Sequence, residues 1–212
     1  MSESLIKTKE IELKRQIIIE EAAKVIEISG FKNAKMEDIA HAVGFSKASL
    51  YSYFKDKEEI AMHIAKGHVQ KFYNKISVLP SMDSKAIEKL DIMKKAHMEF
   101  VKISKNFMII RPNFTLMQNA HEEFIELKLK CFEVLKSILK QGQDEKIFNK
   151  HLDLDGCANL LEALFTGIAF ISSVTKDVKF DLIKEFNMEN MTSFAMDFFY
   201  MAITNTNTEI CK

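Results

Sequence analysis

The residues between Gly44 and Ile60 combine the side chain types that read and hold DNA. This stretch, GFSKASLYSYFKDKEEI, brings short or hydroxyl-bearing side chains, two tyrosines and three lysines onto a short element. A helix reads the major groove where small or hydrogen-bonding side chains let its backbone come close, and a lysine there reaches O6 and N7 of guanine. Residues of these types are Lys47, Ala48, Ser49 and Ser52. They predict a surface that contacts base edges.

Neighbouring residues suit the DNA backbone. The hydroxyls of Tyr51 and Tyr53 and the amine of Lys57 are placed to hold phosphates. Taken alone, however, such lysines are usually solvated and such tyrosines are often half-buried core residues. Acidic residues slightly outnumber basic ones between Met1 and Ile60, so net charge gives the DNA interpretation no support.

Short helices are expected to position these side chains. Apolar residues at steps of three and four predict a helix over 11–28 that ends at Gly30, and a second over 36–43 that ends at Gly44. Ser46 can cap a third helix, which is expected over 48–54. Two short helices joined by a glycine-containing turn make a helix-turn-helix, whose second helix fits the major groove.

Many spaced positions over about residues 15–62 agree with one known pattern. They are Ile18-Ile19-x-x-Ala22, Gly30-Phe31, Asp38-Ile39-Ala40, Gly44-Phe45-Ser46 and Leu50-Tyr51-x-Tyr53-Phe54-x-x-Lys57-Glu58. This pattern resembles the N-terminal signature of TetR-family transcriptional regulators. The resemblance implies that Lys47, Ala48, Ser49, Tyr51 and Ser52 face bases or lie near them, and that Tyr53 and Lys57 bind the DNA backbone.

The chain departs from the family pattern at two positions. Lys35 stands where the family usually has a threonine that caps the second helix, which weakens the cap but adds a candidate phosphate contact. Ala48 stands where the family often has glycine, which alters how closely the backbone approaches the bases.

The rest of the chain predicts further helices and an all-α fold. A composition of 47% apolar residues with six glycines and two prolines favours a helical globule. A fourth helix is expected from Asp56 towards Leu79, and Pro80-Ser81 breaks it at a candidate domain boundary. Later helices are expected over 84–105, 113–141, 154–174 and 188–203. By the resemblance, residues 1–60 form the helix-turn-helix DNA-binding domain and residues 61–212 a ligand-binding and dimerisation bundle.

The last two expected helices carry two apolar seams each, and one seam is then free for a second copy of the chain. The resemblance likewise implies a homodimer joined through the last two helices. The residues expected at this dimer interface are Leu161, Phe165, Ile168, Met191, Ala195 and Phe198.

The resemblance also implies an effector cavity in the C-terminal domain, and phenylalanine and methionine are abundant there. The candidate lining residues are Phe100, Phe107, Met108, Phe114, Met117, Phe124, Phe165 and Phe170. Such residues at helical spacing are also ordinary core. Because this set lacks a charge, the expected effector is uncharged or amphipathic and hydrophobic, and a lining of paired charges would remove that expectation.

The sequence contains no motif for a disulfide framework, a metal site or a catalytic site. Three widely spaced cysteines fit neither a disulfide framework nor a metal motif, and His63 with His68 are five apart, which splays their rings. No phosphate loop or nucleophile motif occurs, so no enzyme activity and no cofactor or metal are expected. Without a long apolar run or a signal-peptide core, the protein is expected in the cytoplasm.

The hypothesis is a ligand-responsive transcriptional regulator, a repressor that binds a palindromic double-stranded DNA operator as a homodimer and is released by a small hydrophobic effector. One alternative is an all-α small-molecule-binding protein or enzyme without DNA binding. Another is a dimeric scaffold without a ligand. Both alternatives leave the clustered pattern from Gly30 to Lys57 unexplained.

Overall fold

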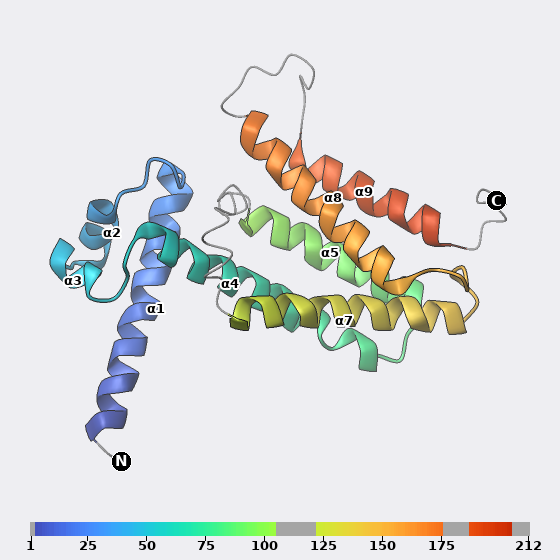
Figure 1. Ribbon diagram of the computed structural model, residues 1–212, viewed down its shortest axis with the longest axis horizontal. Coiled ribbons are helices and arrows are strands. Elements are labelled where there is room, and N and C mark those ends of the chain that lie inside the picture. The colour runs from blue at the N-terminus through green and yellow to red at the C-terminus, as the bar shows by residue number, and fades with distance from the viewer. Residues whose placement is uncertain (1–2, 105–121, 176–186, 205–212) are drawn as a thin grey trace. The chain divides into compact units, whose positions relative to one another are not determined.

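The computed structural model describes residues 3–104, 122–175 and 187–204, and the regular elements in these ranges are helices (Figure 1). One isolated antiparallel bridge joins Phe148 and Thr204. The expected all-α class is confirmed. The contacts between residues divide the chain into two units, and the division falls between Gly67 and His68, within helix α4 (Lys57–Ile76). Over the described ranges, no helix is both long and apolar enough to cross a bilayer.

The first unit contains α1 (Glu3–Ser29), α2 (Met36–Val43), α3 (Lys47–Tyr51) and the first turns of α4. One apolar cluster holds these helices together, because each of them turns a buried face towards it. Its fully or almost fully buried members are Ile18, Ala22, Ile26, Ala34, Met36, Ile39, Ala40, Leu50, Phe54, Ile60 and Ile64. The face of α3 opposite Leu50 is therefore left to solvent.

Local sequence signals set the ends of the short helices. Gly30 and Gly44 both have a φ of +76°, a left-handed conformation that glycine adopts without strain. Ser46 caps α3, since its Oγ accepts a hydrogen bond from the Ser49 N–H at 3.1 Å. The predicted bounds of α2 are confirmed, whereas α3 ends at Tyr51, earlier than predicted, with Ser52 as its C-cap residue.

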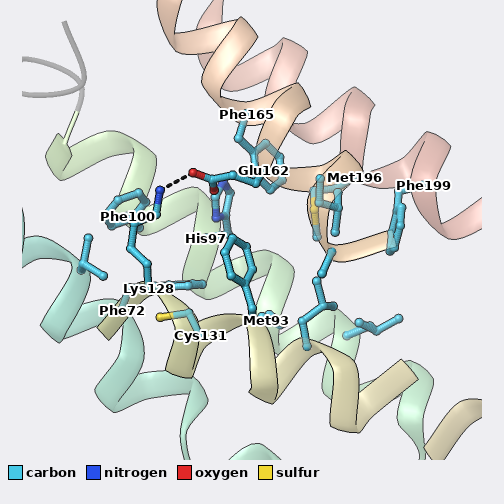
Figure 2. A pocket seen from close by; sticks show the side chains of 16 residues that line it. Phe72, Met93, His97, Phe100, Lys128, Cys131, Glu162, Phe165, Met196 and Phe199 are labelled. Carbon is cyan, nitrogen blue, oxygen red and sulfur yellow. Dashed lines mark hydrogen bonds and ion pairs between the residues drawn. The ribbon is translucent and has the colours of Figure 1, made fainter. Parts of the chain in front are cut away.

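The second unit contains the last turns of α4, the 3₁₀ turn η1 (Leu79–Ser81), α5 (Ala86–Ser104), α7 (Glu122–Asp144), α8 (Leu154–Thr175) and α9 (Met188–Ile203). Helix α5 packs against α7 and α9, and α8 also packs against α7 and α9, so the four helices close a ring. These four helices and the last turns of α4 enclose the apolar core and line a cavity, whose side chains Figure 2 shows.

Candidate functional sites

The exposed face of α3 carries the residues predicted to read bases. Lys47, Ala48 and Ser49 are exposed, and so is Ser52 just after the helix, whereas Leu50 between them is fully buried. Ser52 Oγ donates to the Ser49 carbonyl at 2.6 Å. The structure thus brings small and hydroxyl side chains together on one solvent-facing surface. Their contact with DNA stays a prediction.

Lys47 has a partner that the sequence did not reveal. Its Nζ forms an ion pair with Glu37 of α2, and both side chains are about half exposed, at 56% and 54%. The Lys47 amine holds the pKa of Glu37 below its usual range, so this carboxylate stays ionised. Lys47 Nζ also lies 6.0 Å from the ring centre of Tyr51, which is 45% exposed. To reach a base edge, Lys47 must leave Glu37.

Lys57 makes contacts within the first unit that the sequence did not reveal, and its contact with the DNA backbone stays a prediction. Its Nζ donates to the carbonyl oxygens of Phe31, Lys32 and Ala34 at 2.8, 3.3 and 3.0 Å. It also lies 4.7 Å from the centre of the Phe31 ring. An ammonium group has three N–H donors, and these three carbonyls use them all. Lys57 therefore fastens the loop between α1 and α2 to the start of α4, and a phosphate contact would have to displace these bonds.

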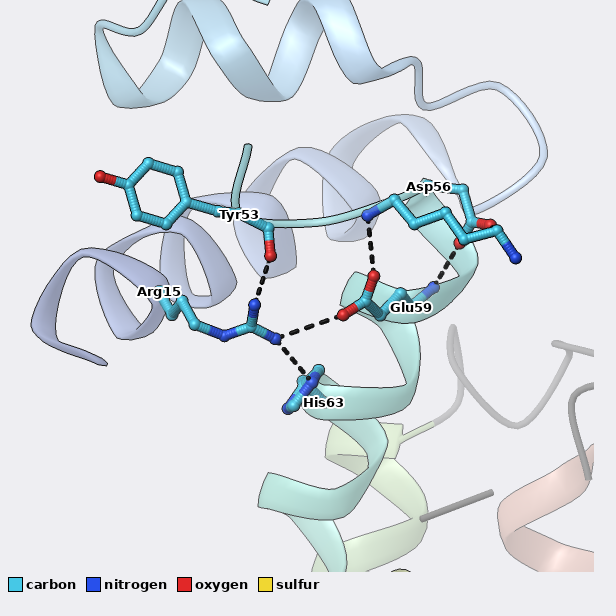
Figure 3. Close-up of polar contacts among 6 residues, drawn as sticks. Arg15, Tyr53, Asp56, Glu59 and His63 are labelled. Atoms are coloured by element: carbon cyan, nitrogen blue, oxygen red, sulfur yellow. Dashed lines mark hydrogen bonds and ion pairs between the residues drawn. The ribbon is translucent and has the colours of Figure 1, made fainter. Parts of the chain in front are cut away.

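Arg15 fixes the segment that follows α3 (Figure 3). Its guanidinium donates to the Tyr53 carbonyl and to Glu59 at 3.3 Å, lies 3.1 Å from Nε2 of His63, and stacks 4.1 Å above the Phe54 ring. The other carboxylate oxygen of Glu59 accepts a hydrogen bond of 2.7 Å from the backbone N–H of Lys55, the residue after Phe54. Arg15 and Glu59 together hold the end of α3 between α1 and α4.

The two remaining candidates for DNA contact are Lys35 and Tyr53. Lys35 is exposed and is the N-cap residue of α2, where its backbone N–H donates to the Asp38 carboxylate at 3.1 Å. Asp38, at the third helical position, thus makes one of the two hydrogen bonds of a capping box, although the threonine usual in the family is absent. The ring of Tyr53 is half-buried, with its centre 5.9 Å from that of Phe45, so it is partly a core residue.

A cavity of about 110 Å³ lies within the second unit (Figure 2). Helices α4, α5, α7, α8 and α9 all contribute to its wall, which is mostly apolar. The lining residues are Val69, Phe72, Leu90, Met93, His97, Phe100, Lys128, Cys131, Phe132, Leu135, Ala158, Leu161, Glu162, Phe165, Met196 and Phe199. The cavity offers a small molecule an apolar surface with few polar groups, which is the usual character of a ligand site.

The predicted lining set is only partly found at this cavity. Phe100 and Phe165 line it, whereas Phe124 is half-buried outside its wall. Phe107, Met108, Phe114 and Met117 lie outside the described residues, and so does the side chain of Phe170.

One ion pair on the cavity wall corrects the expectation of a lining without charge. Lys128 of α7 and Glu162 of α8 form this ion pair (Figure 2). Their side chains are 35% and 36% exposed, so the pair lies where the wall meets solvent. The expectation was wrong because the pair forms between two helices far apart in sequence. The remaining wall is apolar, and the effector expectation that rested on a lining without charge is removed.

His97 is the buried polar residue of the wall, and sequence reasoning missed it. Its ring lies against Phe165, with centres 3.9 Å apart, and borders Phe72 and Phe100 at 5.7 and 5.8 Å. Burial lowers the pKa of the imidazole to about 4, so the ring is neutral near pH 7. A spacing signal existed, since Leu90, His97 and Phe100 fall on one helix face.

Cys131 is half-buried and has the character of an unreactive thiol. Burial raises the pKa of this thiol to about 11, so almost none of it is thiolate near pH 7. In the parts of the chain that the structure describes, His, Cys, Asp and Glu form no cluster able to hold a metal ion.

The residues predicted at a dimer interface fall into two groups. Leu161, Ile168 and Ala195 are at most 8% exposed, because they pack inside their own subunit, and Phe165 lines the cavity. The exposed members of the set are Met191 and Phe198. The large apolar side chains exposed on the outer faces of α8 and α9 are Leu160, Ile171, Met191, Phe194, Phe198 and Met201.

The match to a family model agrees with the geometry of the first unit. Residues 18–64 match the model of the bacterial regulatory proteins of the tetR family. The chain carries a TetR-family helix-turn-helix domain. The match covers α2, α3 and the helix segments that hold them, so the resemblance drawn from the sequence is confirmed.

Other known proteins resemble more of the chain. The fatty acid metabolism regulator protein of Bacillus subtilis (strain 168) is 27% identical over 122 residues, which are 58% of this chain and 60% of that protein's length. The fatty acid degradation regulator FadR of Bacillus halodurans is 20% identical, with a TM-score of 0.64 over 88% of this chain and 94% of its own. Bacillus subtilis FadR in complex with stearoyl-CoA is 18% identical, with a TM-score of 0.64 over 89% of this chain and 98% of the FadR chain. These structures share the TetR-type fold with this chain.

Proposed function

We propose that this protein is a transcriptional repressor that binds a palindromic operator as a homodimer and is released by a small amphipathic effector. The observation that carries the proposal is the solvent-facing surface of α3, where Lys47, Ala48 and Ser49 stand above a fully buried Leu50. A surface of this composition fits a major groove, and two copies related by a twofold axis would meet successive half-sites of a palindrome.

The outer face of α9 supports the dimer. Met191, Phe194, Phe198 and Met201 are 40–64% exposed and follow one another at steps of three and four, so they share one side of the helix. A row of large apolar residues on a surface is typical of a protein contact. A second copy of the same face would cover them.

The effector proposed for the cavity has an apolar body and a polar head. The wall is apolar inside and carries the Lys128–Glu162 pair where it meets solvent. The fatty acid regulators among the similar proteins, one of them in complex with stearoyl-CoA, support an acyl chain as that body. A cavity of about 110 Å³ is smaller than the roughly 300–1,000 Å³ of drug-sized sites, so a long chain must displace wall residues such as Met93 and Met196.

This displacement supplies the difference in affinity that regulation needs. An effector shifts an equilibrium only if it binds one state better than the other, and typical coupling of ~1–3 kcal/mol changes affinity about 5–150-fold. Helix α4 belongs to both units, since Val69 and Phe72 line the cavity and Lys57 and Glu59 lie in the first unit. We propose that movement of this helix carries the signal.

The test is a titration of duplex DNA from the region upstream of the protein's own gene, followed by fluorescence anisotropy. We expect preferential binding over a scrambled duplex, with log affinity falling against log salt by roughly 0.9 for each phosphate neutralised. Stearoyl-CoA should then release the duplex, whereas free coenzyme A should not. A protein that ignores its own upstream DNA at low salt but binds the acyl ligand would instead be a small-molecule carrier.

A further inference from the structure

Among the residues that the structure describes, the buried Nε2 of His97 has no hydrogen-bond partner, and His97 lies on the cavity wall. His97 is only 9% exposed. A buried polar atom without a hydrogen-bond partner destabilises the folded protein, so its presence on a cavity wall needs an explanation. The three phenylalanines around the ring, Phe72, Phe100 and Phe165, offer it no acceptor or donor.

The other polar groups of the wall leave Nε2 to a ligand. Lys128 and Glu162 are paired with each other, and the thiol of Cys131 is a weak donor. A trapped water needs two to four polar partners, and the apolar wall around His97 suits it poorly. The stacked position against Phe165 holds the ring in place, so its nitrogen is presented in advance of binding.

We propose that the effector carries an uncharged hydrogen-bonding group, a carbonyl or a hydroxyl, within the part of it that enters the cavity, and that Nε2 of His97 binds this group. This inference rests on the proposed effector site and adds a chemical requirement to it. A wholly apolar molecule would fill the cavity but leave Nε2 unsatisfied, and the site therefore discriminates against it.

The charge state of the ring excludes an anionic group at this depth. Burial keeps the imidazole neutral near pH 7, so it offers a carboxylate no opposite charge. An ionised group moved into an apolar wall without a partner is strongly disfavoured. A charged head is therefore confined to the region of Lys128 and Glu162, and the group at His97 is neutral.

The test compares three probes of nearly equal shape: ethylbenzene, acetophenone and 1-phenylethanol. A dry cavity of about 150 Å³ in another protein admits benzene, so these slightly larger single-ring probes should enter the cavity of about 110 Å³ if wall side chains such as Met196 move aside. Binding to the full-length protein is measured by NMR through the methyl signal of Met196, which wild type and both variants keep. Affinities are compared between wild type and His97→Leu, which removes the polar atom at similar volume, with Met93→Leu as the control variant.

We expect His97→Leu to weaken acetophenone or 1-phenylethanol roughly three- to tenfold relative to ethylbenzene, and Met93→Leu to leave that ratio unchanged. In the wild type, the ¹⁵N resonance of His97 Nε2 should move with a polar probe and stay in place with ethylbenzene, a measurement that does not depend on the variant folding. Equal effects on all three probes, or an unmoved ¹⁵N signal, would overturn the role of His97 and leave the effector cavity standing. Failure of every probe to bind the wild type would overturn the cavity as well.

Discussion

At the scale of single residues, Lys57 is predicted to stabilise the DNA-binding unit in the absence of DNA. Lys57→Met keeps the aliphatic stem beside Phe31 but removes three hydrogen bonds to backbone carbonyls. Hydrogen bonds from a charged donor are worth more than neutral ones, so the variant should lose ~1–3 kcal/mol of unfolding free energy. Chemical denaturation of the free protein measures this loss.

The matched control is Lys55→Met, because the Lys55 side chain is 84% exposed. Its ion pair, from Nζ to Oδ2 of Asp56 at 3.8 Å, is long and should contribute little. This variant should leave the stability of the free protein unchanged. A Lys57→Met variant as stable as wild type that weakened only DNA binding would contradict the stabilising role and support the phosphate contact implied by the family resemblance.

The ion pair between Lys47 and Glu37 is expected to restrain DNA binding. Glu37→Gln removes the carboxylate that holds the Lys47 amine and should raise operator affinity a few-fold, as measured by anisotropy at fixed salt. Removing a negative charge near DNA would itself raise affinity, so the same change is made in a Lys47→Ala background. The gain should shrink there. An undiminished gain would show that Glu37 acts by charge alone.

At the scale of the elements, Gly142 is predicted to be irreplaceable in α7. A Cβ atom at this position would overlap the ring of Phe148, which is fully buried. Gly142→Ala should therefore lower the unfolding free energy by ~1–3 kcal/mol, although alanine is the better helix former. Gly67→Ala in α4 is the control, since an added Cβ there meets open space and should stabilise by ~0.5–1 kcal/mol. Equal stabilisation by both changes would contradict the close packing of Phe148.

The helices could be predicted where their signals are local. The bounds of α2 and α9 were predicted correctly, because a glycine in the left-handed region ends α2 and an asparagine caps α9. The end of α3 was predicted too late, since the bonds that fix it come from Arg15 in a distant helix. The contacts of Lys47, Lys57 and Lys128 join segments that are separate in the sequence. The spacing of residues along one sequence gives no signal for such contacts.

At the scale of the whole molecule, the outer face of α9 is predicted to form the dimer. Replacing both Phe194 and Phe198 by glutamate should give a monomer in sedimentation velocity, because two charged faces would then meet. Operator affinity should fall with it, since each copy then binds a single half-site. Val78→Glu, at a position 54% exposed, is the control for the added charge. A dimeric double variant would place the interface elsewhere.

The measurement that tests base reading by α3 most directly is the affinity of wild type and Lys47→Ala for an operator in which each base pair is changed in turn. We predict that Lys47→Ala loses its preference at one or two positions, by ~1–3 kcal/mol, and keeps it at the others. A uniform loss of affinity at every position would contradict the assignment of Lys47 to a base edge.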